Sequence, residues 1–531
     1  MLRIQAFLFL LAVLALPGTA SAQTQRWVYT HDGPGNQWDQ SWRVICREDT
    51  TVYVCGDCQL SAIPFTFDMT VVGLTEGGDE RWTYKYSGPG PDQAYDVVAG
   101  SDGNLYVVGS SFDLSTSNDF TVLSVDDTGA QRWVYRHANP GIDLGRALVQ
   151  GADGNIFASG TSEDYGQFTV ISLTPGGQEN WVFGRGPGEA LAIAAGPDSS
   201  VYAAGYAVDS LDNCDIAVAA VLSDGDEKWF YRYDGPGHSG DSARAIAVGS
   251  DGRVYVCGHS RGAGTDLDFA TICLDPSDGS EMWVHRYDGP GNSYDVASSL
   301  VAGEGVYVGG ISTLAGSFAT AFTVLALTDS GTERWVYCDT GGRAAALNIV
   351  AALAQDQSGN LYAAGEMAGT ETTRYDAVVT SLTGSGTLRW RYMYAGPDTV
   401  TDYFSSVTVG PDGNIYASGT TGDPPDSDWL VVSLTQSGAV RETRPVVRKQ
   451  AFAAGTVFRD EIHIRCAAPS DNPLHVALSD ILGRTVFERK LAATPQQVAL
   501  RNESLRRLGA GLYFLRLETD KTLSQIKLIK P

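Results

Sequence analysis

The chain has 531 residues, which is more than one ordinary hydrophobic core fills, so we expect several domains or one large repeat domain. Its net charge of −25 argues against nucleic acid and against an anionic membrane surface, because such partners are held largely by Lys and Arg. Glycine is abundant (61 residues) while proline is not (21), which indicates many tight turns in a folded chain rather than disorder.

The first 22 residues are typical of a secretory signal peptide. Arg3 precedes an apolar run over residues 6–16, and Ala20-Ser21-Ala22 offers a small-residue cleavage site before Gln23. No later stretch approaches the ~18 apolar residues that a spanning helix needs. We therefore expect an exported protein that does not span the membrane.

A repeat occupies most of the remaining chain. Tryptophan recurs about every 50 residues, in units that also share a Gly-Pro-Gly type loop, an Asp-Gly turn and a strand that ends in leucine. Asp-Gly between two alternating runs predicts a hairpin, since glycine accepts the positive φ of the turn. The repeated tryptophans are Trp27, Trp82, Trp133, Trp181, Trp229, Trp283, Trp335 and Trp390. Four short antiparallel strands per unit predict an all-β fold, a β-propeller of four-stranded blades.

The count predicts eight blades and the way in which they close. The last unit reaches Leu434 and has no ninth tryptophan strand, whereas the strand around Trp27 has no unit of its own. We expect this N-terminal strand to complete the last blade, which removes an open sheet edge. Seven blades are the alternative, because the units that begin at Trp181 and Trp335 depart most from the pattern.

The repeat resembles that of secreted bacterial β-propeller proteins over residues 27–441. Its Gly-x-x-x-Trp pattern, as in Gly129-Ala130-Gln131-Arg132-Trp133, is also similar to the eight-bladed quinoprotein repeats. The alcohol dehydrogenases of that class carry adjacent cysteines beside the quinone, and no Cys-Cys pair occurs in this sequence. The resemblance implies a propeller over residues 23–441 and no particular activity, and we predict no catalytic residue and no bound cofactor.

The C-terminal part has another character. A basic linker over residues 442–455 leads to strand-like phrases over 456–531 that resemble a type A C-terminal sorting domain of the type IX secretion system. The matching phrases are Asp480-Ile481-Leu482-Gly483-Arg484, Gly511–Leu517 and Lys527–Lys530, whereas Asn472-Pro473-Leu474 departs from the family's Asn-Pro-Phe. The resemblance implies a small β-sandwich that engages the type IX secretion machinery, so the protein is expected to be secreted or attached to the outer cell surface.

Cysteine and histidine give no clear site. Cys55-Gly56-Asp57-Cys58 is a lone Cys-x-x-Cys without the strand-to-helix context of a redox motif. We interpret most cysteines as small buried hydrophobic residues and keep a Cys55–Cys58 bridge as the alternative. Three of the seven histidines, His31, His137 and His285, replace aromatic residues at repeat positions, and no two of the seven have metal-ligand spacing.

Aspartate supplies the candidate metal ligands. One aspartate follows the Gly-Pro-x loop in several units, just before the strand expected to line the central channel; these residues are Asp39, Asp96, Asp241, Asp295 and Asp402. A ring of carboxylates at one mouth of the channel is a candidate site for Ca²⁺. The alternative is that each aspartate accepts backbone N–H groups of its own turn. A second set of aspartates begins the third strand of six units and suits a strand cap.

Two functional hypotheses follow. We favour a non-enzymatic exported scaffold for adhesion, or for binding a ligand, an extracellular protein or a glycan. The alternative is an exported enzyme, a hydrolase, lyase or quinoprotein-like oxidoreductase, with its site at the channel mouth. Departures from the repeat that cluster at one mouth would indicate a site, whereas departures scattered over the rim would not.

Overall fold

The computed structural model describes the chain from residue 25 to 436 and part of the C-terminal segment. Residues 34–36, 63–64, 164–165, 212, 317–318, 342–346, 370–374, 397–399 and 424–425 are not described, and beyond 436 the described segments are 452–454, 461–466, 474–480, 484–491, 497–501, 511–518 and 523–530. The predicted signal peptide (1–22) and most of the predicted linker (442–455) therefore lie outside the described residues. The chain forms two compact units, Met1–Tyr394 with Val400–Glu442 and Ala395–Thr399 with Thr443–Pro531, and only strands and turns occur in the described parts.

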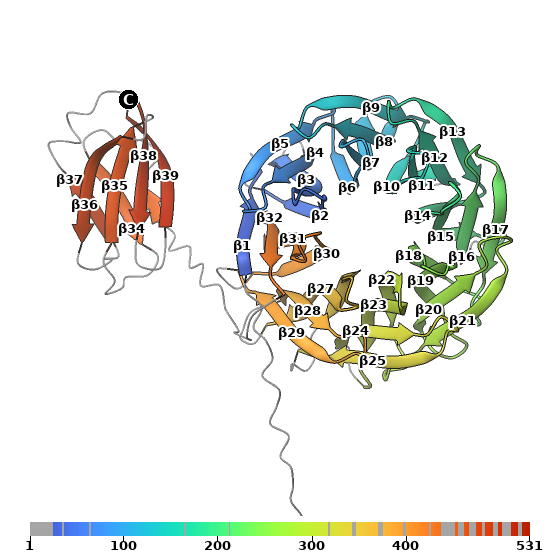
Figure 1. The fold of residues 1–531 in the computed structure, drawn as a ribbon. Helices are drawn as coiled ribbons and strands as arrows, with labels where there is room; N and C mark the ends of the chain where they lie inside the picture. Colours follow the sequence, from blue (N-terminus) through green and yellow to red (C-terminus); the bar gives the residue numbers. More distant parts are fainter. Residues whose placement is uncertain are drawn as a thin grey trace, which may run out of the picture. The chain divides into compact units, whose positions relative to one another are not determined.

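The first unit is an eight-bladed β-propeller, as predicted (Figure 1). Each blade is a four-stranded antiparallel sheet, and blades 1 to 7 each use four consecutive strands. Blade 1 contains β2 (Asp39–Cys46), β3 (Val52–Ala62), β4 (Phe65–Leu74) and β5 (Glu80–Tyr86), and blade 2 contains β6 (Asp92–Ala99), β7 (Leu105–Asp113), β8 (Ser117–Val125) and β9 (Gln131–His137). Blade 3 contains β10 (Leu144–Gln150), β11 (Ile156–Ser162), β12 (Gln167–Leu173) and β13 (Glu179–Arg185), and blade 4 contains β14 (Gly188–Ala195), β15 (Val201–Val208), β16 (Cys214–Val221) and β17 (Glu227–Tyr233). Blades 5 to 7 contain β18 (Ser242–Val248), β19 (Val254–Arg261), β20 (Leu267–Leu274) and β21 (Glu281–Tyr287); β22 (Val296–Gly303), β23 (Gly305–Thr313), β24 (Thr320–Leu327) and β25 (Glu333–Asp339); β26 (Ile349–Gln355), β27 (Leu361–Ala368), β28 (Tyr375–Leu382) and β29 (Leu388–Tyr394).

Blade 8 closes the ring with strands from both ends of the unit. It consists of β30 (Asp402–Val409), β31 (Ile415–Asp423), β32 (Asp426–Leu434) and the N-terminal strand β1 (Gln25–His31). β1 pairs antiparallel with β32, from Gln25 opposite Leu434 to His31 opposite Trp429. The predicted closure is confirmed, and the seven-blade alternative is wrong. The first strand of every blade lies nearest the central axis, and we call these eight strands the inner strands (Figure 1).

Among the described residues, seven of the eight repeated tryptophans, all but Trp390, fasten an outer strand to the next blade by a hydrogen bond from the indole N–H. The Trp133 indole on β9 donates its N–H to the carbonyl oxygen of Pro175, 3.0 Å away in a turn of blade 3. Gly177 in that turn has a φ of +81°, and a Cβ on it would lie 2.5 Å from the indole. Only glycine combines this conformation with so close an approach. The Gly-x-x-x-Trp pattern therefore links consecutive blades. The glycine turn packs against the tryptophan of the preceding blade, and the tryptophan that follows it packs against the glycine turn of the next blade.

The cysteines of the propeller are free. Cys55 and Cys58 lie on β3 and are fully buried, and burial raises the pKa of both thiols. Residues three apart on a strand face opposite sides of a sheet, so their Cβ atoms point apart. The alternative of a Cys55–Cys58 bridge is wrong for this reason.

The second unit contains two antiparallel sheets. One has the order β33 (Phe452–Ala454), β34 (Glu461–Cys466), β37 (Gln497–Arg501), and the other has the order β36 (Thr485–Leu491), β35 (Leu474–Asp480), β38 (Gly511–Glu518), β39 (Leu523–Lys530). Val476, Leu478, Phe487 and Tyr513 of the larger sheet are buried. The packing of the two sheets into a sandwich stays a prediction. Among the described residues of the chain, no helix is long and apolar enough to cross a membrane.

Candidate functional site

The five aspartates predicted as metal ligands do not form one set. Asp39, Asp241, Asp295 and Asp402 occupy equivalent positions, at or just before the start of an inner strand, and all are buried. Asp96 lies further along β6, where it accepts the N–H of Leu148 from blade 3 and pairs with Arg43 of blade 1 at 3.3 Å. Asp96 is therefore not equivalent to the other four, because the loop before β6 is shorter than the loops that precede Asp39, Asp241 and Asp295. Metal binding by Asp96 stays a prediction. The equivalent positions in blades 2, 3, 4 and 7 hold Asp92, Asp143, Gly188 and Asn348.

These aspartates tie the loop to the blade. Asp241 accepts the N–H of Gly235 in its own loop at 2.6 Å and the N–H of Arg261, at the end of the second strand, at 2.8 Å. Asp295 does the same with Gly289 and Thr313. The pattern recurs at Asp39, Asp92 and Asp143. These five carboxylates therefore have a structural role as loop clamps; for Asp402, residues 397–399 of the loop lie outside the described residues.

Three of the clamps also belong to carboxylate clusters. In each cluster, one oxygen from each of three aspartates lies within 4.8 Å of the others: Asp32, Asp39 and Asp428; Asp215, Asp234 and Asp241; Asp268, Asp288 and Asp295. Arg232 and Arg286 pair with one aspartate of the second and third clusters, at 2.7 and 2.6 Å. Calcium binding by the clamps stays a prediction.

A β-bulge interrupts every inner strand at the same point. In β6, Ala94 pairs with Gly109 and Asp96 pairs with Val108, which leaves Tyr95 as the extra residue. A Cβ on Gly109 would lie 1.8 Å from the carbonyl oxygen of Gln93. The same close approach, between 1.8 and 2.1 Å, occurs opposite the bulge in all eight blades. This explains why a glycine recurs in the otherwise Val- and Tyr-rich second strands.

The residue type at the bulge differs from blade to blade. The bulge residues are Trp42, Tyr95, Arg146, Leu191, Arg244, Ser298, Ala351 and Ser405 in blades 1 to 8. All eight lie toward the same end of the axis, because every blade has the same strand order and carries the bulge at the same point of its inner strand. Large aromatic or basic side chains occur in blades 1, 2, 3 and 5, and small ones in blades 6, 7 and 8. The departures from the repeat therefore cluster, which is the outcome that indicates a site.

The large bulge residues form a continuous row. The rings of Trp42 and Tyr95 have centroids 6.1 Å apart, and the guanidinium of Arg146 lies over the Tyr95 ring at 5.2 Å. All three side chains are half-buried. Their contacts cross two blade boundaries, so the row is a shared surface rather than part of one blade's core.

Hydrogen bonds extend this row on both sides. The Trp42 indole donates to Asp57 at 2.6 Å, and Gln40 donates to the Tyr403 hydroxyl of blade 8 at 2.9 Å. On the other side, Arg146 binds Glu189 of blade 4 at 2.6 Å, and the Tyr206 hydroxyl donates to the same carboxylate at 3.2 Å. The Tyr95 hydroxyl also donates to Gln93 at 2.9 Å. We call these connected side chains, together with Glu366, which acts electrostatically on Tyr403, the axial network; its members are Gln40, Trp42, Asp57, Gln93, Tyr95, Arg146, Glu189, Tyr206, Glu366 and Tyr403.

Two carboxyl groups of the network have strongly raised pKa values. Burial raises the pKa of Asp57 to about 7, against the hydrogen bond from Trp42, and burial raises that of Glu366 to about 7 as well. Both carboxylates act electrostatically on Tyr403, whose pKa burial also raises. Carboxyl groups with such pKa values are partly protonated near neutral pH, which is the range that suits a general acid or base.

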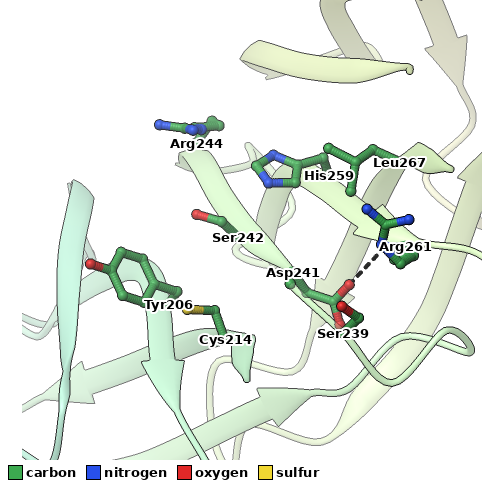
Figure 2. A pocket seen from close by; sticks show the side chains of 10 residues that line it. Tyr206, Cys214, Ser239, Asp241, Ser242, Arg244, His259, Arg261 and Leu267 are labelled. Atoms are coloured by element: carbon green, nitrogen blue, oxygen red, sulfur yellow. Dashed lines mark hydrogen bonds between the residues drawn. The ribbon is translucent and has the colours of Figure 1, made fainter. Parts of the chain in front are cut away.

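An open pocket of about 430 Å³ continues the network between blades 4 and 5 (Figure 2). Tyr206 and Cys214 line it from blade 4, and Ser239, Gly240, Asp241, Ser242, Arg244, His259, Arg261 and Leu267 line it from the side of blade 5. Burial, and after it the charge of Arg244, lowers the pKa of His259 to about 4, so its imidazole is neutral at physiological pH.

The sequence did not predict the axial network, nor did it predict Asp92 and Asp143 as members of the loop clamps. The fixed glycine of each second strand was a usable signal, since a glycine inside a strand often marks a bulge. Aligning the units on that glycine would have found the variable residues opposite it. The hydrogen bonds between blades could not be found this way, because they depend on ring closure.

Two family models match parts of the chain. Residues 240–464 match the family model of the outer membrane protein assembly factor BamB, and residues 458–531 match that of the secretion system C-terminal sorting domain. A sorting domain of this kind, the type IX type, indicates export to the cell surface or the medium, which agrees with the predicted signal peptide. No curated protein matches the chain.

Solved structures with a similar fold include two dehydrogenases and a secretion component. A europium-containing methanol dehydrogenase is 10% identical, covers 77% of this chain and 93% of its own, and has a TM-score of 0.45. The quinohemoprotein alcohol dehydrogenase from Comamonas testosteroni is 12% identical, with coverage of 83% and 80% and a TM-score of 0.46. PorZ, a surface component of the type IX secretion system of Porphyromonas gingivalis, is 11% identical, with coverage of 92% and 74% and a TM-score of 0.27.

Proposed function

We propose that this eight-bladed propeller protein, exported by a type IX sorting domain at residues 458–531, binds a glycan through its axial network. The observation that carries the proposal is the division of the eight equivalent bulge positions. Aromatic and basic side chains gather in blades 1, 2, 3 and 5, and small ones in blades 6, 7 and 8.

The repeat supplies its own control for this argument. Asp57 lies opposite Gln40, and the equivalent residue in blade 6 is Ile311 opposite Val296. The fold is therefore satisfied by apolar residues at this position. A carboxyl that is only 2% exposed is costly to bury, so its presence in blade 1 points to a role other than stability.

The chemistry of the network suits a polyhydroxylated ligand. A sugar ring presents C–H faces that pack on aromatic rings, and Trp42 and Tyr95 offer two half-buried rings side by side. Its hydroxyl groups both donate and accept hydrogen bonds, which suits the mixture of carboxylate, amide and guanidinium groups around the rings. Because these side chains already hold one another, little ordering is needed when the ligand binds.

The test is a glycan array probed with the purified full chain, followed by calorimetry on the oligosaccharides that bind. We expect Trp42→Ala to weaken binding at least 10-fold, about 1.4 kcal/mol, through loss of the stacking surface. Ser298→Ala, at the equivalent bulge of blade 6, is the matched control and should leave the affinity unchanged. Absence of binding on the array, or equal binding by Trp42→Ala and the wild type, would overturn the proposal.

A second candidate function rests on the raised pKa values of Asp57 and Glu366. A carboxyl that keeps its proton near neutral pH can donate it to the oxygen of a glycosidic bond, while an ionised partner takes a proton from the attacking water. The products are two shorter saccharides. Incubation of bound oligosaccharides with the wild type should then release new reducing ends, and Glu366→Gln should bind but not cleave. Intact oligosaccharides after prolonged incubation would leave binding as the function.

A further inference from the structure

The pocket between blades 4 and 5 offers a cation that nothing in the described parts of the protein neutralises. Arg244 is the bulge residue of β18, and its side chain is exposed at the pocket (Figure 2). Among the residues that the structure describes, it makes no hydrogen bond and no ion pair. Other arginines of the inner strands differ, since Arg43 on β2 pairs with Asp96 and Arg146 on β10 pairs with Glu189. An unpaired guanidinium in a protein with a net charge of −25 needs a reason.

The imidazole next to Arg244 adds an unused polar atom. His259 lines the same pocket, and its Nδ1 is buried without a hydrogen-bond partner in the described structure. A neutral imidazole carries one donor and one acceptor, so this ring can donate an N–H to a ligand oxygen. A buried polar atom without a partner is a cost that a ligand can remove.

The acidic residue of the pocket does not compete with a ligand for Arg244. Asp241 is fully buried, and its two oxygens accept the backbone N–H groups of Gly235 and Arg261. The Arg261 side chain pairs with Asp266 at 3.0 Å. The pocket therefore presents a free guanidinium and a neutral imidazole, with its one lining carboxylate bound behind them.

We infer that this pocket holds the anionic substituent of the glycan, a carboxylate or a sulfate ester on a sugar ring. The inference rests on the proposed function, and it deepens it by naming an acidic saccharide as the ligand class. Guanidinium forms two parallel hydrogen bonds with such oxyanions, and charge-assisted bonds are about twice as strong as neutral ones. Tyr206 belongs to both the network and the pocket, so one oligosaccharide can occupy both.

A matched set of ligands tests the charge directly. The probes are a galacturonic acid trisaccharide, the same trisaccharide as its methyl ester, and a sulfated galactose oligosaccharide, each titrated by calorimetry into the full chain. We expect at least one acidic probe to bind 10-fold or more tightly than the ester, and the difference between the carboxylated and sulfated probes identifies the anion. Arg244→Gln should reduce the acid's affinity to that of the ester and change the ester's affinity less than twofold.

Arg253→Gln is the control. Arg253 is in the same blade, in the turn between β18 and β19, whereas Arg244 is near the start of β18. The control variant should keep the full preference for the acid. If neither acidic probe bound the wild type more tightly than the ester, or if Arg244→Gln weakened acidic probe and ester equally, the inference would be overturned and glycan binding would stand. Failure of every saccharide to bind would overturn the proposed function itself, and the inference with it.

Discussion

The glycine opposite each bulge should be irreplaceable, and Gly258→Ala tests this in blade 5. A Cβ on Gly258 would lie 2.0 Å from the carbonyl oxygen of Ser242 and 2.7 Å from the Cα of Ala243. Since non-bonded heavy atoms prefer about 3.5 Å, β18 and β19 must separate by about 1 Å or more. Separation weakens the ladder hydrogen bonds on either side of the bulge, so we expect a loss of about 2–4 kcal/mol in the free energy of unfolding.

Gly240→Ala is the matched control, because it makes the same chemical change two residues before β18. A Cβ there meets no heavy atom within 4 Å, and Gly240 does not have a positive φ. We expect this variant to be unchanged or stabilised by up to about 1 kcal/mol, through the reduced freedom of the unfolded chain. Urea unfolding followed by tryptophan fluorescence measures both variants. Coincident unfolding midpoints for the two would refute the argument that backbone approach fixes the glycine.

Three further predictions concern a carboxyl group, a tryptophan and the cysteines. Burial raises the pKa of Glu366 to about 7, so the folded state binds its proton more tightly than the unfolded state and loses stability as pH rises from about 4.5 to 7. Glu366→Gln should flatten the pH dependence of urea midpoints in this window, and an unchanged slope would contradict the assignment. Trp133→Phe removes the hydrogen bond to Pro175 and should cost about 1–3 kcal/mol in the same assay, with a midpoint equal to that of the wild type as the contrary result. Cys338 is exposed and should react with a thiol reagent at once, whereas Cys55 is buried and should react only after unfolding; labelling of Cys55 in the native protein would oppose this.

The fold could be predicted from the sequence because the pattern of one blade occurs eight times. Each tryptophan, Asp-Gly turn and leucine-ended strand appears in a separate unit, so one divergent unit, such as that of Trp335, does not hide the pattern. The closure of blade 8 by β1 followed from a count of strands alone. The same averaging hides a site, because a site is formed by the residues that do not repeat, such as Trp42 and Tyr95.

The candidate aspartates show why repetition misleads about function. They attracted attention as a ring of similar acids, yet Asp241 recurs because every loop of this kind needs an acceptor for the same two N–H groups. The residues that carry the proposed chemistry differ in type from blade to blade, so no repeated pattern marks them in the sequence. Asp57 and Glu366 occupy equivalent positions in blades 1 and 7, and the equivalent residue in each of the other six blades is neither aspartate nor glutamate.

The bulge separates the two demands that the inner strand must meet. Its flanking residues stay in register with the second strand, and the glycine opposite it keeps the backbones close, so the fold constrains both. The extra residue pairs with nothing across the sheet and is free to change without loss of the ladder. Eight such positions at one end of an axis form a surface on which side chains can be exchanged blade by blade. In this chain, large aromatic or basic side chains occupy four of these positions: Trp42, Tyr95, Arg146 and Arg244. A ligand that contacts all four must span blades 1 to 5.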